Sequence, residues 1–271
     1  METAAPRSPA ESYEQYFVPA MFTPWATALL GHAAPRPSER VLDVACGTGA
    51  VARQAAPLVG AQGQVAGLDM SPAMLDVARG LPPPAGAAIT WHEGNAMTLP
   101  FPDAAFDIVL CQHGLQFVPD RAAAVREMRR VLGPGGRALV IVLQAIERHP
   151  VFRALMEATA RHLALPLASV TLPFSLGDAE SLRTLFAGAG FAAVEVVPET
   201  ITARFGDADR FVPLAVTSAA AALPAFAQLA APARVSMLDA VRRELEPTLA
   251  AYREGDTIAF PMRAHVAIAR A

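Results

Sequence analysis

The 271-residue chain contains no lysine, so all 22 of its basic residues are arginine, and its formal net charge is −3. Proteins that bind nucleic acid usually carry a basic stripe or patch, and this sequence has none. The densest cluster, Arg126, Arg129 and Arg130, lies beside Glu127 on one predicted helix, which indicates a solvated face. We therefore expect no nucleic-acid partner.

Cysteine is nearly absent as well, with Cys46 and Cys111 as the two thiols. A pair of thiols in a chain of this length favours a reducing compartment and buried, unbridged cysteines. Two thiols alone make no metal centre, and no cluster of histidine, cysteine and acidic residues has ligand spacing. We expect no metal site.

Long apolar runs are missing too. The chain begins with Met-Glu-Thr-Ala-Ala-Pro, which lacks the basic and apolar regions of a secretory signal. The alanine-rich tract at 217–233 is interrupted by Pro224 and Pro232 before it reaches the length of a membrane span. These features predict a soluble, cytoplasmic protein without membrane insertion.

What the sequence does have is a strand, a glycine turn and a helix in succession at 41–58. The apolar run that begins at Val41 predicts a buried parallel strand, and a helical pattern starts at Val51. Gly47 and Gly49 in between allow positive φ and carry no Cβ, so a ligand can lie against the backbone there. Asp43, inside the strand, can orient this loop and face a cationic amino group.

A second apolar strand at 64–68 ends at Asp69. A carboxylate one β-α-β unit after a glycine turn can accept hydrogen bonds from both hydroxyls of a ribose, so the pair indicates a nucleoside site. The spacing Gly47-x-Gly49-x-x-Ala52 also fits the dinucleotide fingerprint, and a nicotinamide-dependent oxidoreductase is one alternative. The residues that follow Asp69 separate the two interpretations.

Further segments occur in a fixed order: Met70-Ser71-Pro72, Glu93-Gly94-Asn95-Ala96-Met97, the strand at 106–111, Gly114–Asp120, and Arg130–Gly136 before a strand at 137–143. This block, about 41–143, resembles the class I S-adenosylmethionine-dependent methyltransferases. It is most similar to the branch that holds the ubiquinone and menaquinone biosynthesis C-methyltransferases and many small-molecule enzymes. The resemblance covers about half of the chain. It implies an α/β, doubly wound, seven-stranded sheet in the order 3-2-1-4-5-7-6, with the last strand antiparallel and helical lid insertions.

The resemblance also implies S-adenosylmethionine as the cofactor and a set of residues that bind it. Asn95 stands where the family usually carries an aspartate for the adenine amino group, and an amide oxygen can accept the same hydrogen bond. Tyr16, from an N-terminal helix, is the residue we expect to reach the cofactor carboxylate. The full expected set is Tyr16, Asp43, Ala45, Cys46, Gly47, Gly49, Asp69, Met70, Met74, Gly94, Asn95, Ala96, Met97 and Gln112.

The pattern divides the chain into five segments. They are an N-terminal helical cap at 1–38, a Rossmann-like cofactor-binding core at 39–145, helices with the sixth strand at 146–205, a helical lid insertion at 206–256, and the final antiparallel strand at 257–271. Residues 1–10 are expected to be disordered. Pro19 and Pro24 are expected to split the stretch at 11–33 into short helices.

The lid insertion is strongly apolar, which favours a hydrophobic small-molecule acceptor. The same surface also fits packing in a homodimer. His113 lies just past the fourth strand, where the resembled family places residues near the transferring methyl group, and we take it as the candidate general base. A positioning or structural role for this histidine stays open. His149 and His162, near the following helix, can face either the pocket or water.

The leading interpretation is a methyltransferase that acts by in-line displacement on a quinone-like or natural-product acceptor, at carbon or oxygen. One alternative keeps the cofactor without the reaction, in a pericyclase or cyclase where the sulfonium supplies only charge. A non-catalytic subunit of the same fold is a further alternative, but the intact Asp43, Gly47, Gly49 and Asp69 argue against it.

Overall fold

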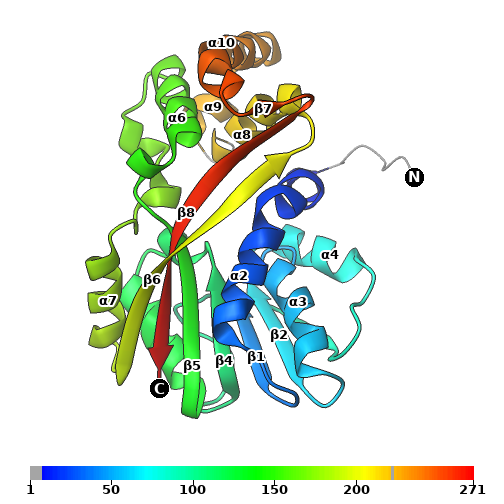
Figure 1. Cartoon of the computed structure of the whole chain (residues 1–271), viewed down its shortest axis with the longest axis vertical. Coiled ribbons are helices and arrows are strands. Elements are labelled where there is room, and N and C mark those ends of the chain that lie inside the picture. Colours follow the sequence, from blue (N-terminus) through cyan, green and yellow to red (C-terminus); the bar gives the residue numbers. More distant parts are fainter. Residues whose placement is uncertain (1–7, 221–222) are drawn as a thin grey trace.

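A mixed sheet forms the centre of the molecule (Figure 1). The computed structural model describes residues 8–220 and 223–271. Within those residues the strand order is β3-β2-β1-β4-β5-β8-β6, with a short β7 paired to β8. The strands are β1 (Arg40–Val44), β2 (Gln64–Asp69), β3 (Ile89–Glu93), β4 (Phe106–Gln112), β5 (Leu132–Leu143), β6 (Ala193–Phe205), β7 (Arg253–Glu254) and β8 (Thr257–Arg270).

The predicted topology is confirmed. β1 to β5 pair in parallel, and β8 is antiparallel to both β5 and β6. β8 is the seventh strand of the predicted order, because the two-residue β7 was not foreseen and shifts the numbering. β5 begins at Leu132 rather than at the predicted Arg137, since Leu132 already pairs with Phe106 ahead of an irregularity in the register. The carboxyl ends of β1, β2 and β4 share one edge of the sheet.

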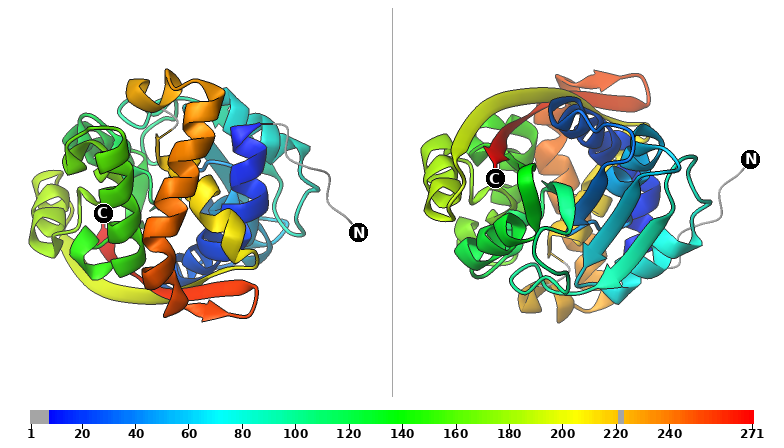
Figure 2. Two further views of the ribbon diagram at one scale, coloured as in Figure 1. Left: turned by 90° about the horizontal axis from the view of Figure 1, so that it is seen from above. Right: turned by 90° about the horizontal axis from the view of Figure 1, so that it is seen from below.

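Helices cover both faces of the sheet (Figures 1 and 2). One buried cluster joins α2 and α3 to the sheet, and a second joins α5 and α7 to its opposite face. The larger helices are α2 (Thr23–Ala33), α3 (Ala50–Val59), α4 (Pro72–Gly80), α5 (Arg121–Arg130), α6 (Pro150–His162), α7 (Ala179–Gly188), α8 (Ala208–Ala220) and α10 (Ala231–Ala250), and the single-turn α9 (Pro224–Ala227) precedes α10. The residues that α2 buries in this cluster include Trp25 and Leu29, and both are fully enclosed.

The N-terminal segment differs from the expectation. Ser8 caps α1 (Pro9–Ser12) in a capping box with Glu11, so residues 8–10 are ordered, whereas 1–7 lie outside the described residues. The proline at 19 does not divide the segment. It lies inside η1 (Tyr13–Phe22), a π-helical stretch that runs directly into α2. Proline cannot donate a backbone hydrogen bond in either an α- or a π-helix, and the chain keeps its helical path at 19 without that bond. Such π-helical stretches are frequent at functional sites.

The upper part of the molecule in Figure 1 is helical. α6, α8, α9 and α10 gather there around the extended ends of β6 and β8. α6 and α10 are joined by Glu244, which accepts a hydrogen bond from Arg161 and pairs with His162. A buried set of phenylalanine rings links this region to the sheet: Phe152, Phe174, Phe205, Phe211 and Phe260. Residues 221–222, inside the expected lid insertion, lie outside the described part.

Candidate functional site

The loop after β1 has an unusual backbone. Ala45, Gly47 and Gly49 all adopt positive φ, at 56°, 56° and 89°. A Cβ on Gly49 would lie 2.3 Å from Cη2 of Trp91, so no other residue fits there without a shift. A non-glycine residue in this region of φ is costly and is often kept at functional sites. The loop therefore presents bare backbone at the carboxyl edge of the sheet, as the glycine pattern predicts.

Asp69 holds this loop in place. Its Oδ2 accepts a hydrogen bond from the backbone N–H of Gly47 at 2.8 Å, and its Oδ1 accepts one from the N–H of Ser71 at 2.9 Å. A carboxylate has about four lone-pair positions, so acceptor capacity for a further donor remains. The next residue, Met70, is 76% exposed. An apolar side chain so placed is available to cover a flat ligand.

Asp43 is almost fully buried in β1. Its Oδ2 accepts a hydrogen bond from the N–H of Ala52 at 3.0 Å, which fixes the first turn of α3. Burial, and secondarily the charge of Asp69, raises the pKa of Asp43 to about 8. Among the described residues, its Oδ1 and the hydroxyl of Thr48 have no hydrogen-bond partner although both are buried. Unpaired buried polar atoms are costly unless a ligand or water meets them.

The loop after β3 completes the edge of the site. The N–H of Gly94 donates to the carbonyl of Asp69 at 3.0 Å. Asn95 is exposed, and its Oδ1 accepts from the N–H of Met97 at 2.9 Å. This oxygen closes the turn and keeps one lone pair for another donor. Ala96 and Met97 pack against the buried cluster below.

Arg130 fixes the chain beyond this turn, a role that the sequence analysis missed. Its guanidinium donates to the carbonyls of Leu99 and Phe101 and to the carboxylates of Asp103 and Glu127. Glu127 in turn accepts from the N–H of Leu99 at 2.8 Å. The expectation of a solvated face is therefore wrong for Arg130. Glu127 and Arg130 are three residues apart on one helix, and this spacing of opposite charges was the signal in the sequence for the pair.

The helical cap reaches the site through Tyr13. A Cβ on Gly47 would lie 3.8 Å from the Tyr13 hydroxyl, so the tyrosine ring lies over the loop. Burial, with the charges of Glu14, Asp69 and Asp43, raises the pKa of Tyr13 and keeps it protonated. The expected residue, Tyr16, instead lies under the guanidinium of Arg210, 4.3 Å from its ring centroid. Tyr13 is thus the tyrosine that η1 places beside the loop.

His113 and Gln112 follow β4 at the same edge. His113 has a positive φ of 51°, and burial, with the charge of His149, lowers its pKa to about 3. Its imidazole is therefore neutral. Gln112 donates through Nε2 to the carbonyl of Phe22 at 3.1 Å, which ties the end of η1 to the sheet. A Cβ on Gly114 would lie 2.4 Å from Cβ of Ala45, so the loops after β1 and β4 touch.

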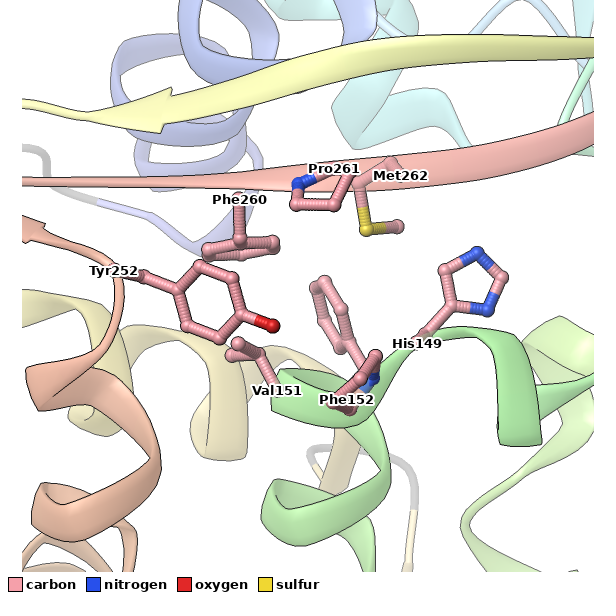
Figure 3. Close-up of a pocket in the computed structure, with 8 residues that line it drawn as sticks. His149, Val151, Phe152, Tyr252, Phe260, Pro261 and Met262 are labelled. Atoms are coloured by element: carbon pink, nitrogen blue, oxygen red, sulfur yellow. The ribbon is translucent and has the colours of Figure 1, made fainter.

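The remaining candidate histidines have structural partners. His149 is buried, accepts from the N–H of Arg263 at 3.1 Å and lies 3.2 Å from the carbonyl of Ala145. It lies at one end of a narrow crevice between α6 and β8, which Phe152, Tyr252 and Met262 also line (Figure 3). His162 pairs with Glu244. Both histidines thus have hydrogen-bond partners within the fold.

The described residues offer neither a cluster of metal ligands nor a membrane-spanning helix. No group of three or more histidine, cysteine or acidic side chains is arranged to hold a metal ion in residues 8–220 and 223–271. In the same residues, no helix combines the length and apolar character needed to cross a membrane. Cys46 and Cys111 are both buried and free.

Comparison with known proteins gives the family. A model described as a methyltransferase domain matches residues 42–140. The chain is 41% identical over 119 residues to the 2-phytyl-1,4-naphtoquinone methyltransferase of Synechococcus elongatus. This match covers 43% of this chain and 51% of that protein. The chain is also 34% identical over 188 residues to the ubiquinone/menaquinone biosynthesis C-methyltransferase UbiE of Shewanella woodyi. That match covers 63% of this chain and 73% of that protein.

Among solved structures, the [4+2]-cyclase SpnF matches 92% of this chain, and the match covers 80% of that chain, with a TM-score of 0.53 and 22% identity. At that identity the likeness shows the fold alone. The chain belongs to the class I S-adenosylmethionine-dependent methyltransferases, as the motifs predicted. It spans about half the length of the first of the relatives named above.

Proposed function

We propose that the protein transfers the methyl group of S-adenosylmethionine to a hydrophobic small molecule of quinone-like or natural-product type, at carbon or oxygen. The observation that carries the proposal is the convergence of Asp43, the loop at 45–49 and Asp69 at one edge of the sheet. The names of the two relatives, a naphthoquinone and a ubiquinone/menaquinone methyltransferase, support the acceptor class.

The residues at this edge fit the proposed methyl donor. The donor carries a ribose, a purine, a cationic amino group and a carboxylate. Asp69 keeps acceptor capacity for a diol, and the buried, unpartnered Oδ1 of Asp43 can accept from a cationic group nearby. Met70 is exposed where a purine can pack. For the carboxylate, we assign the protonated hydroxyl of Tyr13 in place of Tyr16, since it lies beside Gly47.

When bound, S-adenosylmethionine supplies a methyl group on a sulfonium, which is activated for in-line displacement. What remains for the protein is to align the acceptor and to exclude water. The N-terminal cap excludes water, because Tyr13 lies over the loop and because the hydrogen bond from Gln112 to the carbonyl of Phe22 holds the cap on the sheet. A bound acceptor that arrives protonated must lose that proton, and His113, which directly follows β4 at this edge, is the candidate general base.

Release of S-adenosylhomocysteine tests the proposal. Purified protein is incubated with S-adenosylmethionine and a panel of demethyl quinols, phenols and enols, and both products are followed by mass spectrometry. We expect equal amounts of S-adenosylhomocysteine and of a product heavier by one methylene. Conversion of a compound without a mass gain, and without consumption of the donor, would instead support the cyclase alternative. A folded chain that binds neither the donor nor S-adenosylhomocysteine at millimolar concentration contradicts both.

A further inference from the structure

Trp25 carries a polar atom that the core does not use. The residue is fully buried in α2, and its indole Nε1–H has no hydrogen-bond partner among residues 8–220 and 223–271. A buried tryptophan N–H usually finds a partner, and a buried donor without one costs about 1–3 kcal/mol. This cost points to a hydrogen-bond acceptor that is not among the described residues of the chain.

His113 lies next to it. The two ring centroids are 5.4 Å apart and the planes meet at 74°. Both ring nitrogens of His113 are buried and, in the described part of the chain, also lack partners. Phe22 also packs against the imidazole, with its ring centroid 6.0 Å away. Two neighbouring side chains from α2 and from the end of β4 thus leave three nitrogen atoms unpaired.

These unpaired atoms adjoin the candidate site. The residue after His113, Gly114, lies against Ala45 of the loop after β1. Gln112, on the other side, keeps a buried Oε1 without a partner in the described residues while its Nε2 holds Phe22. The cluster of Trp25, Gln112 and His113 therefore offers two N–H donors, one imidazole nitrogen and one amide oxygen. None of these side chains carries a charge, because burial keeps the imidazole neutral.

We propose that Trp25 and His113 together hold an oxygen atom of the methyl acceptor, with the indole N–H and the imidazole N–H both donating to it. This inference rests on the proposed function and narrows its substrate to a ring compound that bears a hydroxyl, enol or carbonyl oxygen. A hydrocarbon would leave both donors unpaired, and a protonated amine has no lone pair for the indole. His113 acts here as a hydrogen-bond partner of the acceptor, and Trp25 becomes a specificity-determining residue.

The two tryptophans of the chain, Trp25 and Trp91, make the test direct. The ¹⁵N-labelled full chain, saturated with S-adenosylhomocysteine, shows one indole resonance for each, and a Trp91→Phe variant assigns them. Phenol and toluene are then titrated as probes of nearly equal shape, with and without an oxygen. We expect phenol to move the Trp25 indole proton downfield and toluene to leave it nearly unmoved. An equal response to both probes, or no response of Trp25 to phenol, overturns the proposal.

Variants give an independent readout. Trp25→Phe keeps an aromatic ring and removes the N–H, and we expect phenol to bind about fivefold more weakly, as for the loss of one hydrogen bond. His113→Asn keeps an N–H donor and should retain the preference for phenol over toluene, whereas His113→Phe should lose it. Undiminished phenol binding in Trp25→Phe contradicts the proposal. If a variant fails to fold, the wild-type titration decides alone, and failure to bind S-adenosylhomocysteine overturns the proposed function first.

Discussion

The carboxylate of Asp69 accepts a 2.8 Å hydrogen bond from the backbone N–H of Gly47, which fastens the loop after β1 to the end of β2. The second carboxylate oxygen accepts a hydrogen bond from the N–H of Ser71, the N-cap of α4. A single side chain therefore positions both the loop after β1 and the start of α4. The residue expected to bind a ribose thus also builds the loop on which the ligand would rest. Loss of this side chain has two separable consequences.

Replacement of Asp69 by alanine should weaken S-adenosylhomocysteine binding by roughly 1–3 kcal/mol, because charge-assisted hydrogen bonds to the ribose are lost. It should also lower the free energy of unfolding without ligand by about 1–3 kcal/mol, since two backbone donors lose their acceptor. Calorimetry measures the first and urea denaturation the second. Asp76→Ala, an exposed carboxylate on α4, is the matched control and should change neither. Unchanged affinity in folded Asp69→Ala would refute our placement of the adenosine.

Gly49→Ala should cost more stability than its backbone conformation alone explains. A positive φ costs an alanine about 1–2 kcal/mol, and the new Cβ would also lie 2.3 Å from Trp91. Gly190→Ala is the control, because Gly190 has a φ of 85° and open space around its Cβ position. We expect denaturation to give a loss for Gly49→Ala that exceeds that of Gly190→Ala by about 1–3 kcal/mol. Equal losses would mean that Trp91 yields easily.

Arg130→Ala should lower the free energy of unfolding and loosen the segment at 99–103, whereas Arg126→Ala should do neither. Arg130 is bonded to two carbonyls and two carboxylates, and Arg126 is exposed on the same helix. Breaking a partly buried network of this kind costs on the order of 2–4 kcal/mol. Hydrogen exchange should show faster exchange of the Leu99 amide in Arg130→Ala. Similar exchange in both variants would indicate that the network contributes little.

The sequence predicts the sheet and the loop for a simple reason. A buried parallel strand is a continuous apolar run, and a turn with positive φ selects glycine, so both leave a local signal at 41–49 and 64–69. The strand order followed from the resemblance, and the structure agrees with it. Asp43 and Asp69 end in the same place because parallel strands present their carboxyl ends at one edge.

The features that were missed depend on contacts distant in sequence or on an unexpected local geometry. η1 is a π-helix, so the i→i+5 pattern turns Tyr13 toward Gly47 and Tyr16 toward Arg210, whereas α-helical spacing places both tyrosines on one face. The role of Arg130 depends on carbonyls at 99 and 101, which no local pattern links to it. The unpaired nitrogens of Trp25 and His113 appear only when the surrounding core is known.

Asp43 should make the free energy of unfolding fall as the pH rises. Burial raises its pKa from 3.8 to about 8, so between these values the folded chain holds a proton that the unfolded chain has released. In that interval the unfolded state binds fewer protons, and stability drops with pH by at most about 1.4 kcal/mol per pH unit from this group. Asp43→Asn cannot ionise and keeps an oxygen for the N–H of Ala52. Urea denaturation of both proteins across this interval should therefore show the variant gaining on the wild type as the pH rises.

Asp107 provides the control of opposite sign. Its hydrogen bonds with Arg40 hold its pKa below the usual value, so its contribution to stability is present above the unfolded pKa and is lost as the pH falls through the folded one. Asp107→Asn should therefore lose stability relative to the wild type as the pH rises from acid to neutral, whereas Asp43→Asn should gain it. If instead the curves of Asp43→Asn and the wild type run parallel, Asp43 ionises normally in the folded chain. Its buried Oδ1 would then have to be satisfied by water rather than kept for a ligand.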